Sequence, residues 1–229
     1  MAIAFVQNLG NLSTGSATFL TGTFASPTVN GNFIATSTRV GATGRTVTVD
    51  DNKTNTYAQA KNQVQTTDAS EIFCHYAMDI LGGASHLVTS SISGAAASIR
   101  LTLHEYSGIA TSAALDQTNG SEGDAGTALS SGNITTTQAD ELLFGAGGNS
   151  ASGTLSLGTD YSNLAVSLSA AGLHRLGAED RIVASTGTYS ATFTNSPSTN
   201  WMCLIASFKM AGKAPPLSSR TIPPALLAM

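Results

Sequence analysis

The chain of 229 residues carries a formal net charge of −4 at pH 7, and only 10% of its residues are charged. Soluble domains average about 25% charged residues, so the polar surface of this protein must come mainly from uncharged groups. The sequence holds 30 Thr and 28 Ser residues, which supply those groups. Because 41% of the residues are apolar, the composition indicates a folded protein. Lys and Arg are scattered singly, which argues against the basic stripe of a nucleic-acid-binding protein.

The sequence predicts neither a membrane span nor a secretory signal. No stretch approaches the roughly 18 consecutive apolar residues that a membrane helix needs. The N-terminal residues MAIAFVQNLG lack a positive n-region and have too short an apolar run for a signal peptide. We therefore expect a protein that is not exported by the general secretion route, although its composition is typical of extracellular proteins. A virus particle fits both observations, because its proteins are made in the host cytoplasm and work outside it.

Short segments with alternating apolar and polar residues, rich in β-branched side chains, recur about every ten to fifteen residues. The predicted strands lie near Ile3–Gln7, Ser16–Phe24, Phe33–Arg39, Thr46–Val49, Tyr57–Ala60, Ile72–Met78, His86–Ile92, Ser98–Tyr106, Thr127–Ile134, Glu141–Ala146, Arg181–Ser185, Tyr189–Thr194 and Trp201–Lys209. Leu164–Leu173 is the only stretch that resembles a helix. This pattern predicts an all-β, single-domain antiparallel β-sandwich, jelly-roll-like, over residues 1–211.

Two of these strands carry the clearest patterns. In Ser98–Tyr106, alternation places Ile99, Leu101 and Leu103 on one face, and Glu105 follows them on that apolar face. Either a β-bulge redirects this carboxylate or the strand has left the core by that point. Trp201–Lys209 is apolar on both faces, which predicts a central strand covered on both sides.

The two cysteines, Cys74 and Cys203, both lie in apolar strand-like segments. They fit two buried thiols, and a disulfide between neighbouring strands is the alternative.

The last residues, 212–229, have the sequence GKAPPLSSRTIPPALLAM and differ in character from the rest. Proline pairs favour an extended polyproline conformation, so we expect an extended C-terminal arm. One interpretation is a frayed tail, and the other is an arm that lies on a neighbouring subunit of a homo-oligomer. The candidate contact residues of the arm are Pro215, Pro216, Ile222, Pro223, Pro224, Leu226 and Leu227.

A cluster of oxygen-bearing side chains follows the strand near Thr46–Val49. Calcium takes six to eight oxygen ligands, and Asp50, Asp51, Asn52 and Asn55 could supply some of them. Their spacing does not match the calcium-loop pattern D-x-[DN]-x-[DN]-G, and Asp and Asn also favour turns. A calcium site and a hairpin turn are therefore both compatible with this segment, and calcium is the only cofactor that the sequence suggests.

The densest set of acidic residues lies in and around the stretch Ala97–Gly147. Its members are Glu105, Asp116, Glu122, Asp124 and Glu141. No cleft-lining aromatics or metal spacing accompany them, so we expect no catalytic pair and no enzyme. We expect Asp116–Gly126 to be part of a long polar surface loop, because such loops commonly carry binding surfaces. Asp116, Glu122 and Asp124 are its candidate interaction residues.

Other familiar motifs are missing from the sequence. The histidines His75, His86, His104 and His174 are dispersed and form no HExxH or HxH pattern. Ser107 lacks the GxSxG context of a nucleophile, and the glycines of Gly145–Gly148 lack the GK[ST] ending of a phosphate loop. Structural roles are expected for all of them.

The segments LHEYSGIATSAALDQ, ITTTQADELLFGAG and ASTGTYSATFT with WMCLIASF resemble an uncharacterised family of β-sandwich modules. Such modules occur in phage virion proteins and in secreted bacterial surface proteins, and the resemblance covers most of Ile3–Phe208. It implies a β-sandwich without a catalytic motif. The missing signal peptide and the arm-like tail favour a virion member.

The resemblance and the composition lead to one expected function and one alternative. We expect a structural component of a phage particle, such as a capsid decoration or other capsid- or tail-associated protein, that binds copies of itself and other virion proteins. The alternative is an extracellular carbohydrate-binding or adhesion module at the cell surface, assisted by calcium. In that case Tyr106, Tyr161 and Trp201 are the aromatic side chains that could stack on sugar rings.

Overall fold

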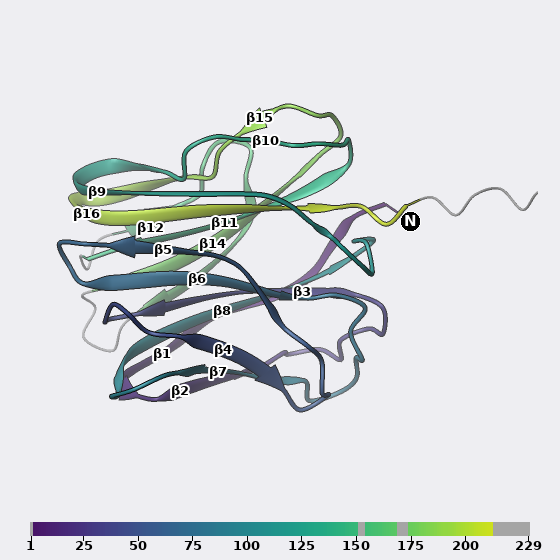
Figure 1. Ribbon diagram of the computed structural model, residues 1–229, viewed down its shortest axis with the longest axis horizontal. Helices are drawn as coiled ribbons and strands as arrows, with labels where there is room; N and C mark the ends of the chain where they lie inside the picture. Colours follow the sequence, from purple (N-terminus) through teal and green to yellow (C-terminus); the bar gives the residue numbers. More distant parts are fainter. Residues whose placement is uncertain (1, 151–153, 169–173, 213–229) are drawn as a thin grey trace, which may run out of the picture.

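The computed structural model describes residues 2–150, 154–168 and 174–212, and within these ranges it consists of antiparallel strands and connecting turns. Three sheets are stacked on one another, with a five-stranded sheet in the middle (Figure 1). The predicted all-β antiparallel sandwich is confirmed, while its jelly-roll connectivity and its arm stay predictions. Residues 213–229, which include all seven candidate contact residues of the arm, lie outside the described residues.

The middle sheet has the strand order β1-β8-β3-β6-β5. Its strands are β1 (Ala4–Ala17), β8 (Ala97–Ser107), β3 (Phe33–Val40), β6 (Ser70–Ala77) and β5 (Ala58–Gln65). A three-stranded sheet, ordered β2-β7-β4, covers one of its faces. That sheet consists of β2 (Phe19–Thr23), β7 (Leu87–Ile92) and β4 (Val47–Asp51).

A six-stranded sheet covers the other face of the middle sheet. Its main path is β12 (Thr154–Ser156), β16 (Thr192–Lys209), β11 (Glu141–Asn149), β14 (Arg175–Val183) and β13 (Ser162–Leu168), and β9 (Leu115–Ser130) also pairs with β16. A short ribbon of β10 (Ile134–Thr135) and β15 (Thr188–Tyr189) lies beyond this sheet (Figure 1).

The middle sheet is buried on both faces, and this explains the continuous apolar segments in the sequence. All eight residues of β3 and all eight of β6 are buried. Alternate side chains enter two different cores: Phe33 and Cys74 lie toward the six-stranded sheet, whereas Ile34 and Phe73 lie toward the three-stranded sheet. Each large apolar side chain that is fully buried stabilises the fold by roughly 1.5–3 kcal/mol.

The prediction for the last strand is confirmed. In β16, Leu204 and Phe208 face the middle sheet, while Cys203 and Ile205 belong to a third apolar cluster on the far side of the six-stranded sheet. Cys74 and Cys203 are both free and buried, in different layers. Burial raises the pKa of the Cys74 thiol to about 12. The interpretation as two buried thiols is therefore confirmed, and the alternative disulfide is not formed.

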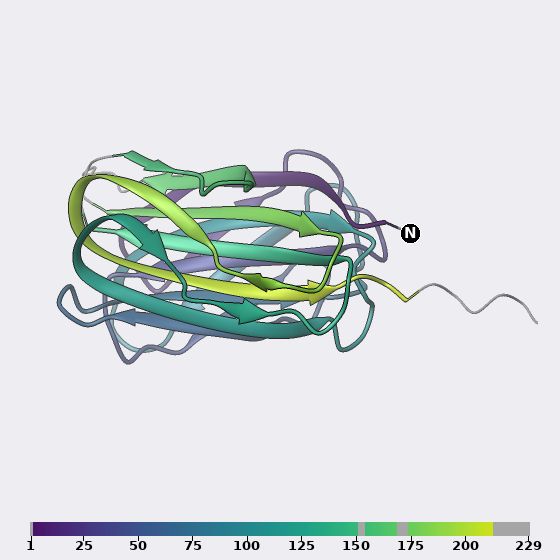
Figure 2. The same cartoon turned by 90° about the horizontal axis from the view of Figure 1, so that it is seen from above.

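The paired strands β9 and β16 are long enough to fold back over their own sheet (Figure 2). Phe193, near the start of β16, lies against Gly147 of β11, where an added Cβ would sit 2.6 Å from Cδ2 of the ring. Ala191 lies against Gly145 in the same way, with its Cβ 2.6 Å from the added atom. Gly145 and Gly147 thus create room for the folded-back strand.

Two sequence predictions were wrong about local structure. Asp116–Gly126 is part of strand β9, which pairs with β16 over most of its length, and not a loop. Its small, polar residues hide the alternation because β9 is an edge strand with half-buried side chains. Leu164 belongs to strand β13 rather than to a helix, since β13 pairs with β14. No helix long and apolar enough to cross a membrane occurs among the described residues.

Contacts between edge strands close both sides of the two larger sheets. On one side, the side-chain amide of Asn8 in β1 donates to the carbonyl of Asn163 in β13 at 2.8 Å. On the other side, Gln65 in β5 donates to the carbonyl of Gly123 in β9 at 3.4 Å. The core between these sheets is therefore enclosed laterally.

We expect Gly147→Ala to destabilise the protein by about 1–3 kcal/mol, because the new methyl group would overlap the Phe193 ring. Gly15→Ala in β1 is the matched control, since an added Cβ there has no neighbour within 4 Å. Urea unfolding measures both differences. An equal stability of the two variants would show that the glycine at 147 is not required by the folded-back strand.

Candidate functional site

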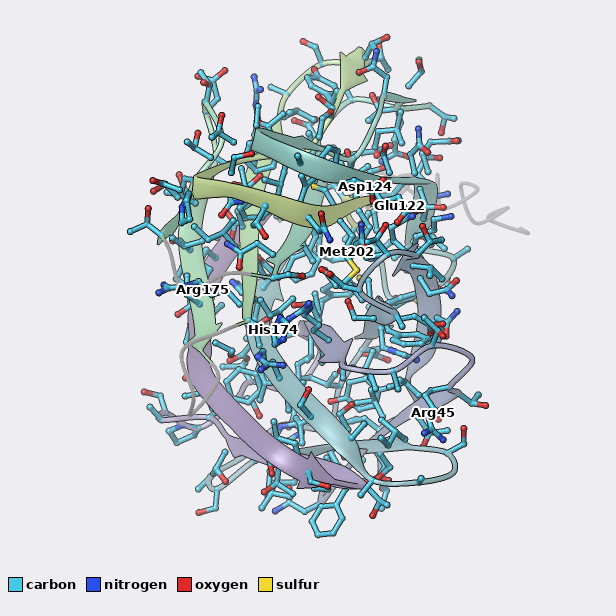
Figure 3. All side chains as sticks on the ribbon, turned by 90° about the vertical axis from the view of Figure 1, so that its left-hand side faces the viewer. Arg45, Glu122, Asp124, His174, Arg175 and Met202 are labelled. Atoms are coloured by element: carbon cyan, nitrogen blue, oxygen red, sulfur yellow. The ribbon has the colours of Figure 1, made fainter. Side chains whose placement is uncertain are left out.

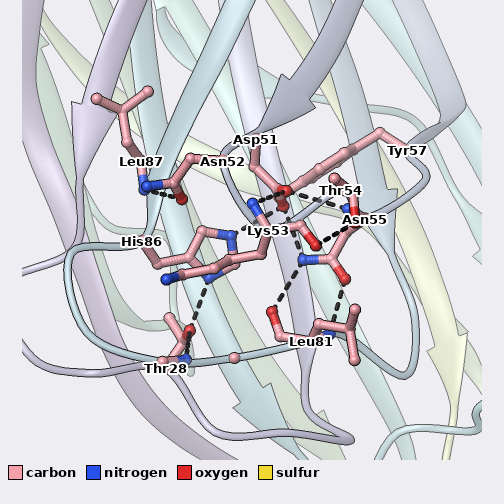
Figure 4. Close-up of polar contacts among 12 residues, drawn as sticks. Thr28, Asp51, Asn52, Lys53, Thr54, Asn55, Tyr57, Leu81, His86 and Leu87 are labelled. Atoms are coloured by element: carbon pink, nitrogen blue, oxygen red, sulfur yellow. Dashed lines mark hydrogen bonds and ion pairs between the residues drawn. The ribbon is translucent and has the colours of Figure 1, made fainter.

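Asp51, at the end of β4, is the centre of a closed hydrogen-bond network (Figure 4). Its Oδ1 accepts from the backbone N–H groups of Lys53 at 2.9 Å and Asn55 at 3.0 Å. Its Oδ2 accepts from the Asn55 amide at 2.8 Å and the Tyr57 hydroxyl at 3.0 Å, and lies 2.8 Å from Nε2 of His86. Five polar groups from four residues thus surround the carboxylate.

The pKa of Asp51 is lowered although burial, the largest influence, raises it. The donors from Asn55, His86 and Lys53 together outweigh burial because they stabilise the ionised form. On the far side of the imidazole, Nδ1 of His86 lies 2.7 Å from the hydroxyl of Thr28. The network therefore fixes the β4–β5 connection to the segment before β3.

The other three calcium candidates have different surroundings. Oδ1 of Asn52 accepts from the Leu87 N–H at 3.0 Å, and Oδ1 of Asn55 accepts from the Leu81 N–H at 2.7 Å. Asp50 is exposed on β4. Among the described residues, no group of three or more His, Cys, Asp or Glu side chains could hold a metal ion. The arrangement is that of a hydrogen-bonded turn, and calcium would have to displace these donors.

Two of the candidate interaction residues, Glu122 and Asp124, hold the turn between β5 and β6 (Figure 3). Glu122 accepts from the N–H of Thr66 at 2.6 Å and from its hydroxyl at 3.1 Å. Asp124 accepts from the hydroxyl of Thr67 at 2.5 Å. These carboxylates therefore connect the six-stranded sheet to the middle sheet.

Asp116 and Glu141 meet at the opposite end of the same strands. Asp116 accepts from the N–H of Thr137 at 2.7 Å and from its hydroxyl at 2.5 Å, and its Oδ1 lies 3.9 Å from Nζ of Lys209. Glu141 is fully buried, and both its carboxyl oxygens lack a well-formed hydrogen bond. Burial, with a smaller contribution from the charge of Asp116, raises the pKa of Glu141 to about 7. The side chain of Ser207 and the backbone N–H of Gln138 lower this pKa, but by less.

The remaining acid of the predicted set, Glu105, is buried and structural. Its Oε1 accepts from the N–H of Val29 at 2.8 Å and the amide of Asn32 at 2.7 Å, and its Oε2 accepts from the amide of Gln7 at 2.7 Å. The register of β1 against β8 shifts next to this residue, between Phe5 and Gln7. The bulge is therefore in the partner strand, and Glu105 remains in the fold interior.

A polar contact crosses the core between the two larger sheets. The hydroxyl of Tyr106 donates to Oδ2 of Asp180 at 2.7 Å, and the amide of Asn163 donates to both oxygens of Asp180 at 2.9 and 3.0 Å. Burial raises the pKa of Asp180 despite these donors. Sequence reasoning missed Asp180 because the segment that begins β14, RLGAED, shows no clear alternation.

Glu179 is a second buried acid that the sequence did not reveal. Its Oε2 accepts from the N–H of Gly158 at 2.9 Å and its Oε1 from that of Thr192 at 3.2 Å. Burial raises its pKa to about 8, although both backbone donors oppose this. Glu179 thus anchors the start of β16 where it folds back.

The histidines are part of the fold rather than a site. Burial lowers the pKa of His75 and of His104 to about 4. Nε2 of His104 lies 3.1 Å from the carbonyl of Asn163. His174 adjoins two buried arginines, described below.

The three aromatic residues expected to stack on sugar rings do not form an exposed platform. Tyr106 and Tyr161 are buried, with their hydroxyls bonded to Asp180 and to the Ser190 carbonyl respectively. Trp201 is half-buried and packs against the third apolar cluster.

A hollow of about 420 Å³ lies at the end of the sandwich where the described chain ends. Ala211 lines it, and the N–H of Ala211 donates to the Gly108 carbonyl at 2.8 Å. Its wall also includes Val6 and Val29, which are 41% and 54% exposed. Val6 and Val29 thus give the hollow an exposed apolar wall.

No protein-family model, curated protein or solved structure matches the chain.

We expect Asp51→Ala to destabilise the protein by about 3–5 kcal/mol, because it leaves buried donors without an acceptor. Asp50→Ala, one residue away and exposed, should change stability by less than about 0.5 kcal/mol. Thermal unfolding with and without added calcium completes the test. A calcium-dependent rise in Tm that Asp51→Ala abolishes would favour the calcium site over the turn.

Glu141→Gln should make the free energy of unfolding less dependent on pH above neutrality. The folded pKa of about 7 lies above the ordinary value of 4.5, so the folded state retains a proton that the unfolded state has lost. The stabilisation from this protonated form is fully present below pH 4.5 and disappears as the pH rises through 7.

The glutamine variant keeps the neutral form at every pH. We expect it to match the wild type at pH 5 and to exceed it by about 1–3 kcal/mol at pH 8.5. The comparison uses the difference in free energy of unfolding between variant and wild type, measured with urea at each pH. The histidines contribute equally to both proteins, so their effect on the pH dependence cancels. A constant difference across this range would contradict the assignment.

Proposed function

We propose that the protein is a structural component of a phage particle, a capsid decoration or other capsid- or tail-associated subunit that works through contacts between subunits. The observation that carries the proposal is the hollow beside Ala211, with Val6 and Val29 exposed on its wall. The resemblance to virion β-sandwich modules supports the same proposal, as does the scarcity of charge, since little charge must be desolvated when subunits pack closely.

The occupant that we propose for the hollow is the C-terminal segment of a neighbouring copy. Residues 222–229, IPPALLAM, contain Ile222, Leu226, Leu227 and Met229, which are apolar enough to fill such a surface. The chain leaves the described fold at Gly212, immediately after Ala211. Nine residues separate Gly212 from Ile222, and a proline-rich linker of that length spans about 28 Å. A linker of this length would allow residues 222–229 to reach the hollow of a neighbouring copy.

Exchange of such arms gives a defined kind of assembly. Because each copy offers one hollow and one arm, copies can exchange arms in a closed dimer or join head to tail in a ring. Other virion proteins with an extended apolar segment could use the same hollow in place of a second copy. A glycan-binding function stays a prediction that binding assays can test, and no exposed aromatic platform among Tyr106, Tyr161 and Trp201 supports it.

We expect the full-length protein to form oligomers and a chain ending at Gly212 to be monomeric, as measured by size-exclusion chromatography with light scattering. Val29→Asp in the full-length chain should also give monomers, because a charge cannot be buried unpaired at the contact. Phe19→Asp is the matched control, since Phe19 is 57% exposed on β2, away from the hollow. The arm proposal would be contradicted if the full-length protein is monomeric at all concentrations. It would also be contradicted if Val29→Asp and the truncated chain both form oligomers.

A further inference from the structure

Two buried arginines face each other across the middle sheet. Arg39 of β3 and Arg100 of β8 are direct partners in the antiparallel register, and each is only 1% exposed. Both side chains enter the layer between the two larger sheets, because their neighbours Val40 and Ile99 belong to the opposite core. Like charges at directly opposed positions of a sheet destabilise it. Such a pair therefore requires a compensating interaction.

The surrounding protein provides few negative groups. Nη2 of Arg39 donates to the hydroxyls of Ser70 at 3.2 Å and Ser150 at 3.5 Å, and lies 3.5 Å from Nδ1 of His174. Nε of Arg100 donates to the carbonyl of His174 at 3.0 Å. No ion pair within 4.0 Å involves either arginine in the part of the chain that the structure describes.

Burial, then the charge of Arg100, lowers the pKa of Arg39 to about 9, so Arg39 is still protonated at neutral pH. Burial, then the two arginines, lowers the pKa of His174 to about 4, so this imidazole is neutral there. The site therefore holds two positive charges at neutral pH. His174 marks its position at the end of the molecule that faces the viewer in Figure 3.

Three buried polar atoms at this place have no hydrogen-bond partner: Nε and Nη1 of Arg39 and Oδ2 of Asp68. The other oxygen of Asp68 accepts from the amide of Asn200 at 2.8 Å. Asp68 is the carboxylate whose charge acts on Arg39, and it lies two residues before Ser70 in the turn into β6. The nearby carboxylate Glu71 belongs to the opposite face of the sheet from Ile72 and accepts from the N–H of Gly44. Buried donors and acceptors in folded proteins nearly always have a partner.

We propose that Arg39 and Arg100 bind a small oxyanion, hydrogen phosphate, between the two larger sheets. A guanidinium group only donates hydrogen bonds, and an ionised carboxylate only accepts them. A ligand that satisfies both Arg39 and Asp68 must therefore carry acceptor oxygens and at least one O–H group. Hydrogen phosphate has both at neutral pH, whereas sulfate has acceptors alone. Charge-assisted hydrogen bonds from a guanidinium group to phosphate oxygens are also stronger than bonds between neutral groups.

The site differs from a surface anion site in its burial. Because both arginines are 1% exposed, the site excludes a bulky phosphate ester or a nucleic-acid backbone. Occupancy would neutralise the facing guanidinium groups and so stabilise the packing of β3 against β8. This inference is independent of the proposed assembly, since it concerns the opposite end of β3 from Phe33, which packs against Phe208 near the hollow.

The test is a titration of the full-length protein with inorganic phosphate, followed by calorimetric unfolding at pH 7 and constant ionic strength maintained with chloride. We expect a saturable rise in Tm, roughly 3–6 °C at about ten times the Kd, and one site per chain by isothermal titration calorimetry. Sulfate should raise Tm less, and glucose 6-phosphate should have no saturable effect. A wild-type protein that shows no saturable response to phosphate, or responds equally to sulfate, would overturn the proposal.

Variants separate specific binding from the general stabilisation of proteins by phosphate and sulfate salts. Arg39→Gln should lose the saturable response, while Arg181→Gln, which removes a partly exposed arginine paired with Asp160, should retain it. Asp68→Asn should remove the preference for phosphate over sulfate, because the asparagine amide can donate to sulfate. Equal responses of Arg39→Gln and Arg181→Gln would overturn the site. If Arg39→Gln does not fold, the comparison of phosphate with sulfate on the wild type still decides the question.

Discussion

The structure depends above all on a middle sheet that must be covered on both faces. Its strands place large apolar side chains alternately up and down, so each of its two cores needs a separate outer sheet. The three-stranded sheet and the six-stranded sheet therefore stabilise each other through strands that both of them touch. A sandwich of two sheets could leave its outer faces in water, whereas here the central strands β3 and β6 are buried on both faces.

That constraint explains where the polar chemistry of the protein lies. Charged groups on the inner strands β3, β6 and β8 are buried, so each requires an internal partner. Glu105 has three donors from Gln7, Val29 and Asn32, which tie the segment before β3 to the sheet. Tyr106 of β8 donates across the core to Asp180 of the six-stranded sheet, which also accepts from Asn163 of the adjacent strand. Arg39 is the exception on the middle sheet, because its Nε and Nη1 have no internal partner.

Many of the strands could be predicted from the sequence, because the alternation of apolar and polar residues can be recognised within each strand separately. The predicted segments around Phe33–Arg39, Ile72–Met78 and Trp201–Lys209 match β3, β6 and the second half of β16. Most of β9 was missed because its half-buried residues are small and polar. The folded-back first half of β16 was missed because its position depends on Gly145 and Gly147 of β11. The facing arginines could not be foreseen, since 61 positions separate them and only the register of β3 against β8 brings them together. The sequence singled out Asp51 as a residue of a calcium site or a turn, but its link to His86 and Thr28 is a property of the tertiary fold.

The place of β16 at the end of the described chain has a consequence for synthesis. This strand pairs with β9, β11 and β12 and provides Leu204 and Phe208 to the core above the middle sheet. Until its residues leave the ribosome, the apolar face formed by Phe33, Cys74 and Tyr106 has no complete cover. Chains of this size fold in stages and expose apolar surface while they wait. The nascent protein thus passes through a period in which a chaperone, or the same face of another nascent chain, can bind where β16 will finally lie.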